Sequence, residues 1–256
     1  MVGAAAGIAA LFGLAFGSFI NVVAYRVPLG KSVIRPPSAC AGCHALIRPQ
    51  DNIPVLSWLL LGGRCRDCGR PIPIRYPIVE AATAALFALT VWIIGLLWAL
   101  PAYLWFVAVT LALVLTDLDH KRIPNRILYP GTIVALALLA GGALLDGAAQ
   151  SLPRALLGGA GYFAGLFLLA LVARGGFGMG DVKLAFLLGL FAAFRSWETL
   201  AASVLLAFGA GGTIAIALLV SGRRGRKDEI PFGPSLVVGS WLGVAVGEPL
   251  VRWYLG

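Results

Sequence analysis

The sequence contains few charged residues and very few acidic ones. Only 12% of its 256 residues are charged, and Asp and Glu together number 11. A soluble globular domain carries about 25% charged residues, so this composition excludes an ordinary soluble domain. Hydrophobic residues instead make up 60% of the chain and recur in long runs. We therefore expect an all-α polytopic membrane protein.

A basic region at the start of the chain is also missing. The first 25 residues carry no charge, whereas a secretory signal begins with basic residues before its apolar core. We expect residues 3–25 to be a first membrane span that is retained, with the N-terminus outside. Its pairs Gly3/Gly7 and Gly13/Gly17 have the spacing of close helix packing. In total, eight apolar runs predict about eight transmembrane helices, near residues 3–25, 78–98, 102–116, 129–146, 153–173, 182–196, 199–220 and 233–253. Because the run 182–196 is short, we expect it either to tilt or to be partly shielded by protein.

The basic residues are distributed unevenly among the connecting segments. If the N-terminus is outside, 17 of the 20 Lys and Arg residues lie on the inner side, and only Arg154, Arg195 and Arg252 do not. This asymmetry follows the positive-inside rule. It places the polar segment 26–77 and the ends of the apolar runs at Asp117 and Asp181 in the cytoplasm. The basic stretch 223–227 is then a solvated inner loop near anionic lipid, and we expect no nucleic-acid partner.

The polar segment 26–77 holds all four cysteines, in two pairs. Each CxxC pair can place two thiolates on one tetrahedral ion, so four thiolates form a closed structural zinc site. A redox role and the absence of any metal are the alternatives, and the adjacent His44 is a possible substitute ligand. We expect the metal to fold this small segment rather than to perform chemistry. The predicted ligands are Cys40, Cys43, Cys65 and Cys68.

Asp117 and Asp181 stand at the edges of two apolar runs. Asp117 follows directly after the apolar run 102–116. Asp181 follows Gly178-Met179-Gly180 and stands directly before the run 182–196. A carboxylate at the edge of a hydrocarbon layer costs about 2.5–3.5 kcal/mol on insertion scales, so it usually has a function. We hypothesise that the two carboxylates meet, share one proton and activate a water molecule.

Other interpretations of these acidic residues are open. One is that both aspartates only cap helix ends at the surface. Asp119 competes with Asp117, but residues two apart on a helix do not share a face, so only one can face Asp181. For the same reason Lys183 should point away from Asp181. A phosphate-binding role for 178–180 is weaker, because that loop follows a membrane span and not a strand.

The residues 116–125 (TDLDHKRIPN) and 178–183 (GMGDVK) resemble the type IV prepilin peptidases, which are membrane aspartyl proteases with a GxGD motif. The resemblance extends to nearly the whole chain, through segments 17–26, 52–57, 75–80 and 231–234. It implies that Asp117 and Asp181 are catalytic. It also implies cleavage of a short basic leader after a glycine, at the cytoplasmic face, just before the apolar helix of a prepilin or pseudopilin. The expected location is the bacterial inner membrane, where the lipid bilayer surrounds the helices.

The cysteine segment is similar to that of bifunctional members, which also N-methylate the new N-terminal residue with S-adenosylmethionine. No glycine-rich fingerprint for such a cofactor is present in the sequence, and Ala41 replaces a proline that the family often has after its first cysteine. We assign no residue to the methyl donor; Glu80 is a weak candidate, and a helix-start acid favoured by the macrodipole is the alternative. The expected domains are a first helix (1–25), a cysteine loop with the methyltransferase region (26–77) and a peptidase domain (78–256).

Two other classes of protein remain for comparison. A proton-coupled carrier would carry acidic residues deeper in its spans, whereas here the other runs contain almost no ionisable groups. A metal-folded membrane scaffold without catalysis would need its cysteines but neither aspartate. The leading hypothesis is therefore a peptidase that uses Asp117 and Asp181.

Overall fold

The computed structural model describes residues 1–172, 178–221 and 232–255. Within them the chain is helical, and its only β pairing is two isolated bridges in the cysteine segment. The basic stretch 223–227 and Pro231, for which we had sequence-based expectations, lie outside the described residues. The elements are α1 (Val2–Arg26), η1 (Pro49–Asn52), α2 (Leu56–Leu60), α3 (Arg75–Ile94), α4 (Leu100–His120), α5 (Asn125–Leu145), α6 (Ser151–Val172), α7 (Met179–Arg195), α8 (Trp197–Val220) and α9 (Gly233–Leu255).

All eight expected apolar runs are helices, which confirms the all-α membrane fold. Seven of these helices, among the described residues, are long and apolar enough to cross a membrane. The remaining long helix, α7, has 17 residues and is buried along most of its length, including Val182, Leu188 and Phe191. The expectation that protein shields this short run is therefore confirmed, and the chain is a multi-pass membrane protein.

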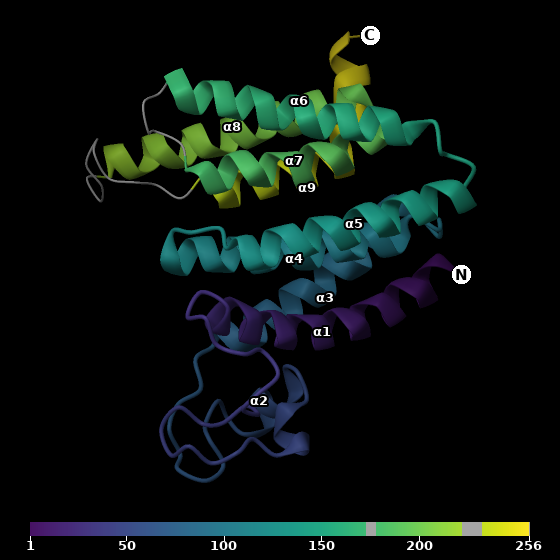
Figure 1. Ribbon diagram of the computed structural model, residues 1–256. Coiled ribbons are helices and arrows are strands. Elements are labelled where there is room, and N and C mark those ends of the chain that lie inside the picture. Colours follow the sequence, from purple (N-terminus) through teal and green to yellow (C-terminus); the bar gives the residue numbers. More distant parts are fainter. Residues whose placement is uncertain (173–177, 222–231, 256) are drawn as a thin grey trace.

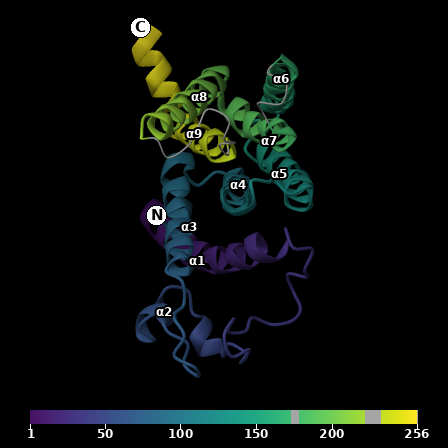
Figure 2. The same cartoon turned by 90° about the vertical axis from the view of Figure 1, so that its left-hand side faces the viewer.

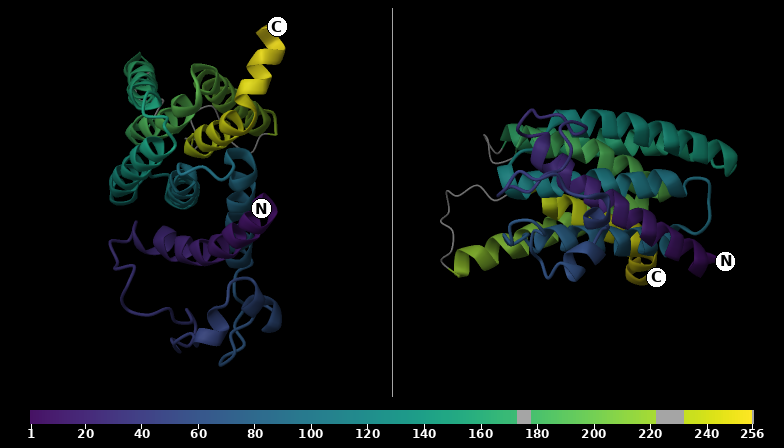
Figure 3. Two further views of the ribbon diagram at one scale, coloured as in Figure 1. Left: turned by 90° about the vertical axis from the view of Figure 1, so that its right-hand side faces the viewer. Right: turned by 90° about the horizontal axis from the view of Figure 1, so that it is seen from below.

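The helices pack around α4 and α7 (Figure 1). α4 contacts α1 and α3 on one side and α5 and α9 on the other, while α7 packs against α6, α8 and α9. The cysteine segment with α2 lies beyond α1, away from the rest of the bundle. Seen from below, both termini lie at the same end of the molecule (Figure 3). The C-terminal end of α1 lies at the opposite end, where the residues that follow it line the same cavity as Asp117 and Asp181.

Glycines let α1 and α3 cross at close range (Figure 2). A Cβ atom on Gly13 would lie 2.6 Å from Ala84 Cα, and one on Gly17 would lie 2.6 Å from Glu80 Cα. Both positions therefore need glycine for packing, as expected from their spacing. The same expectation is wrong for Gly3 and Gly7, where an added Cβ would meet no atom within 4 Å. These two lie beyond the crossing, so spacing alone did not identify the contact.

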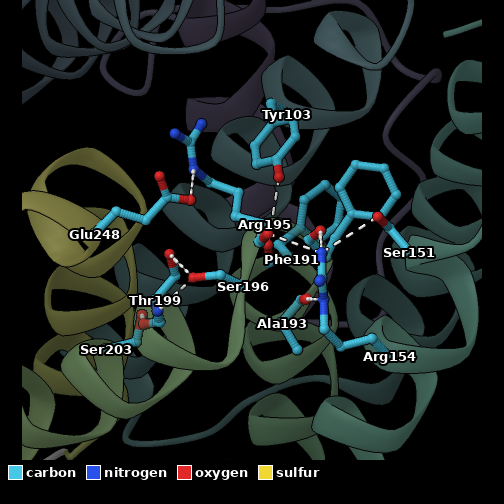
Figure 4. Close-up of polar contacts among 11 residues, drawn as sticks. Tyr103, Ser151, Arg154, Phe191, Ala193, Arg195, Ser196, Thr199, Ser203 and Glu248 are labelled. Carbon is cyan, nitrogen blue, oxygen red and sulfur yellow. Dashed lines mark hydrogen bonds and ion pairs between the residues drawn. The ribbon is translucent and has the colours of Figure 1, made fainter. Parts of the chain in front are cut away.

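Polar contacts at the far end of α7 account for two basic residues that departed from the positive-inside pattern (Figure 4). Arg154 on α6 donates hydrogen bonds to the carbonyl oxygens of Ala193 (2.7 Å), Phe194 (2.7 Å) and Arg195 (2.8 Å). The last carbonyls of a helix have no hydrogen-bond donor within the helix. The Arg154 side chain provides the donors that these carbonyls need. The Arg195 side chain lies 4.0 Å from Glu248 of α9.

Candidate active site

Three helices bring Asp117, Asp181 and Gly233 together. Asp117 lies in the last turn of α4, Asp181 in the first turn of α7, and Gly233 begins α9. A Cβ atom placed on Gly233 would be 2.7 Å from Asp117 Oδ2 and 3.3 Å from Asp181 Oδ1. The separation of these two oxygens therefore cannot exceed the sum of those distances. A single water that hydrogen-bonds to both oxygens at about 2.8 Å each needs them about 5.6 Å apart or less, a range that this upper limit includes.

Both carboxylates are buried but line an open cavity. Asp117 is 5% exposed and Asp181 is 8% exposed, and the cavity beside them has a volume of about 730 Å³. Asp117 Oδ2 has no hydrogen-bond partner among the described residues. A buried carboxylate oxygen without a partner is costly, so this atom is available to a ligand in the cavity. The other walls are the segment 27–30 after α1, the turn between α4 and α5, and the start of α7.

The neighbouring charged residues point away from the pair, as their helical spacing predicts. Asp119 forms an ion pair with Arg75 at 2.7 Å, so it is held at the start of α3. Lys183 donates a hydrogen bond to Asn125 Oδ1 (3.3 Å) on α5. Of Asp117 and Asp119, only Asp117 therefore faces Asp181, as expected. The cavity wall also carries three cations, Lys121, Arg122 and Arg126.

The four cysteines form one cluster. Their sulfur atoms all lie within 4.8 Å of one another, and Cys40 Sγ lies 3.7 Å from Cys68 Sγ. Thiolates bound to zinc at about 2.3 Å in a tetrahedron are about 3.8 Å apart, so the arrangement suits zinc. His44 is not part of the cluster. The two pairs have matching backbone turns, in which the amides of Cys40 and Cys65 donate to the carbonyls of Ala45 and Arg70.

The thiols differ in their local electrostatics. Backbone N–H groups of Cys43 and Gly42 point at Cys40 Sγ and lower the pKa of that thiol to about 6. At Cys68 the Arg70 amide also lowers the pKa, but desolvation and the three neighbouring thiols outweigh it and raise the value to about 11. Four thiols so close together cannot all ionise without a cation. A divalent metal supplies that charge and is the natural partner of this cluster.

Glu80 occupies a different place from the one expected. It is the sixth residue of α3 and is 7% exposed. It therefore lies past the first turn, where the macrodipole acts, and the interpretation as a helix-start acid favoured by the macrodipole is wrong. Its Oε2 accepts a hydrogen bond from the Val55 amide at 2.7 Å. Val55 has a φ of +62°, which is an unusual conformation for a β-branched residue. Glu80 thus joins a strained turn of the cysteine segment to the membrane helices.

Comparison with known proteins assigns the chain to a family. It is 33% identical to a prepilin leader peptidase/N-methyltransferase from Bacillus subtilis over 245 residues, which cover 96% of each chain. The chain belongs to the type IV leader peptidase family. Residues 104–216 match that family, and residues 11–94 match the family described as the bacterial Peptidase A24 N-terminal domain.

Two further relatives carry the same name as the Bacillus subtilis protein. One is from Aeromonas hydrophila, 34% identical over 96% of this chain and 92% of the relative. The other is from Pseudomonas aeruginosa, 34% identical over 96% of this chain and 91% of the relative. No solved structure matches the chain significantly.

The sequence did not predict that Gly233 belongs to the site of this leader peptidase family member. Gly233 was noted only as part of the segment 231–234, without a role. It lies outside the stretch 104–216 that contains both Asp117 and Asp181. Its position beside the two carboxylates follows from how α9 packs on α4 and α7, which local sequence pattern does not reveal.

Proposed function

We propose that this protein is an aspartic endopeptidase that removes the leader of type IV prepilins or pseudopilins at the cytoplasmic face of the inner membrane. The observation that supports it most is the approach of Asp117 and Asp181 to one point beside Gly233, at the wall of the cavity. The relatives are named prepilin leader peptidase/N-methyltransferase, and the leader is expected to end in glycine.

The proposed chemistry uses one ionised and one protonated carboxyl group. Two carboxyl groups held this close share a proton, because both cannot ionise cheaply. The ionised group takes a proton from water while the water oxygen attacks the peptide carbonyl carbon. The protonated group gives its proton to the carbonyl oxygen. The tetrahedral intermediate then collapses: one of its hydroxyls returns a proton to the pair, the C–N bond breaks, and the leaving amine receives a proton from the pair.

The position of the pair suits a substrate that lies partly in the bilayer. Asp117 is near the end of α4 and Asp181 is at the start of α7, so both lie at a membrane–water boundary. The apolar helix of the substrate can stay in the bilayer while its leader reaches the cavity from the water. The cations Lys121, Arg122 and Arg126 repel a basic leader at close range. Attraction of the leader to anionic lipid therefore contributes more to docking than attraction to the cavity.

We further propose that residues 26–77 hold a structural zinc ion and support N-methylation of the new N-terminal residue with S-adenosylmethionine. The four clustered sulfur atoms support the metal, and the names of the relatives support the methyl transfer. Cys40, Cys43, Cys65 and Cys68 would hold the ion. The ion would fix the fold of the segment without entering the peptidase reaction.

The test compares three aspartate substitutions in the purified protein with a prepilin substrate. Asp117→Asn and Asp181→Asn should each lower cleavage by at least about 1,000-fold, because neither variant can form the proton-sharing pair. Asp119→Asn is the matched control: it lies two residues from Asp117, on another face of α4, and should cleave within about 3-fold of the wild type. Mass spectrometry of the pilin N-terminus reports the cleavage position and any added methyl group together.

Two results would contradict the proposal. Cleavage that persists in Asp181→Asn would exclude the aspartate pair as the catalyst. Loss of cleavage in Asp119→Asn to the same degree as in Asp117→Asn, with equal thermal stability, would show that the acidic character of this turn matters and not the pair.

A further inference from the structure

Gly233 has no side chain at the point where a side chain would separate the two aspartates. The Cβ of any other residue there would lie 2.7 Å from Asp117 Oδ2 and 3.4 Å from Asp117 Cγ. It would also lie 3.3 Å from Asp181 Oδ1. The first distance is closer than a carbon and an oxygen approach without a bond. The space next to Gly233 is therefore the space that both carboxylates face.

The sign of φ does not explain why this position is glycine. Gly233 is not among the residues with positive φ, and it is the first residue of α9. The next residue is Pro234, whose ring disfavours a helical conformation in a preceding residue that carries a Cβ. Two constraints therefore disfavour a side chain at this position: the following proline and the space between the carboxylates.

The atom that faces this space is ready for a ligand. Asp117 is 5% exposed, and its Oδ2 has no hydrogen-bond partner among the described residues. Leaving a buried carboxylate oxygen unpaired is unfavourable. An atom of water or substrate beside Gly233 would satisfy it and would also be in reach of Asp181.

The position of Gly233 is held by its neighbours. The Phe232 ring packs against Phe208 of α8 with ring centroids 5.5 Å apart, and the Leu236 amide donates to the Phe232 carbonyl at 3.1 Å. Farther along α9, the Trp241 indole donates to Thr110 Oγ1 of α4 at 3.1 Å. These contacts fix the start of α9 relative to α8 and α4, so a Cβ added at Gly233 could not easily move aside.

We propose that Gly233 is a positioning residue of the peptidase site, which keeps open the space between Asp117 and Asp181 where the attacking water and the peptide carbonyl lie. This inference rests on the proposed function, because it assumes that the two carboxylates are the catalyst. It adds a third helix, α9, to a site that the two aspartates alone place on α4 and α7.

The test is the kinetic behaviour of Gly233→Ala in the full-length protein in detergent, with a prepilin substrate. The added methyl group displaces the reacting groups by about 1 Å or more, so kcat should fall at least about 100-fold. KM should change less than about 3-fold, because the leader and the apolar helix bind elsewhere. The melting temperature should fall less than that of Gly239→Ala, because the carboxylate end of the Asp117 side chain can rotate away from the added methyl group whereas the Ala207 backbone cannot. Gly212→Ala, where an added Cβ meets no atom within 4 Å, is the neutral control.

A second control separates positioning from packing. Gly239 lies on the same helix, and its added Cβ would collide with the Ala207 backbone of α8. Gly239→Ala should therefore lower the melting temperature but leave the kcat of the folded protein nearly unchanged. Near wild-type kcat in Gly233→Ala would overturn the proposal, as would a loss of stability that accounts for the lost turnover. Asp181→Asn, measured alongside, distinguishes this failure from failure of the aspartate mechanism, which would leave Asp181→Asn active.

Discussion

The Arg154 guanidinium donates a hydrogen bond to the Ala193 carbonyl at 2.7 Å and thereby ties α6 to the last turn of α7. Its Nη2 also donates to the Phe194 and Arg195 carbonyls. Because α7 carries Asp181 at its other end, this contact helps to fix the helix that holds one carboxylate. Charge-assisted hydrogen bonds to helix carbonyls are among the stronger polar contacts in proteins.

Arg154→Leu should lower the stability of the protein. The variant leaves three carbonyl oxygens at the end of α7 without their donor, at a cost of about 2–4 kcal/mol. We expect a clear fall in the melting temperature of the detergent-solubilised protein. Arg154→Lys is the matched variant: its ammonium keeps the charge but cannot span three carbonyls, so it should lose less. A melting temperature of Arg154→Leu equal to that of the wild type would show that solvent replaces these contacts.

The positions of the eight long helices could be predicted from the sequence, because each is largely a long run of apolar residues. One difference is at α4, which was expected to end at residue 116 and continues to His120. The final turn, which carries Asp117 and Asp119, extends past the apolar run, and hydropathy alone cannot detect a helix that continues there. Helical spacing did separate the two aspartates correctly.

Contacts between distant segments could not be predicted in the same way. The glycine spacing in α1 fitted Gly3 and Gly7 as well as Gly13 and Gly17, and only the path of α3 decides between them. Glu80 was interpreted as an acid at a helix start, since nothing local shows that the Val55 amide would reach it. Gly233 likewise acquires its place only when α9 meets α4 and α7. Each of these depends on tertiary packing, which a single sequence encodes only indirectly.

The glycine contacts of α1 yield a matched pair of stability predictions. Gly17→Val should separate α1 from α3, because its side chain would collide with the Glu80 backbone. Overpacking of this kind costs about 1–3 kcal/mol, so the melting temperature should fall. Gly7→Val introduces the same side chain into open space and should leave the melting temperature nearly unchanged. Equal melting temperatures of the two variants would contradict the observed crossing.

Glu80 is expected to hold the cysteine segment against the membrane helices. Glu80→Ala leaves the Val55 amide without its acceptor, at a cost of about 1–3 kcal/mol, and the strained turn at Val55 should relax. Hydrogen exchange at residues 53–57 should then become faster. Glu80→Gln keeps an oxygen that can accept from the amide and should protect these residues nearly as well as the wild type. Unchanged exchange in Glu80→Ala would show that the turn is held by other contacts, such as the Ser57 hydroxyl, which accepts from the Ile53 amide.

Removal of the metal should unfold the cysteine segment while the helices stay folded. Four clustered thiols lose their shared cation when a chelator removes zinc, and mutual repulsion of thiolates then opposes the compact arrangement. We expect one zinc per chain in the untreated protein and rapid proteolysis within residues 38–72 after chelation or in Cys43→Ser. Because Asp117 and Asp181 are carried by α4 and α7, kcat for leader cleavage should fall less than about 3-fold. A complete loss of cleavage with intact helices would instead tie the metal to the peptidase reaction, and a chelated segment that still resists protease would show that the cysteines fold it without metal.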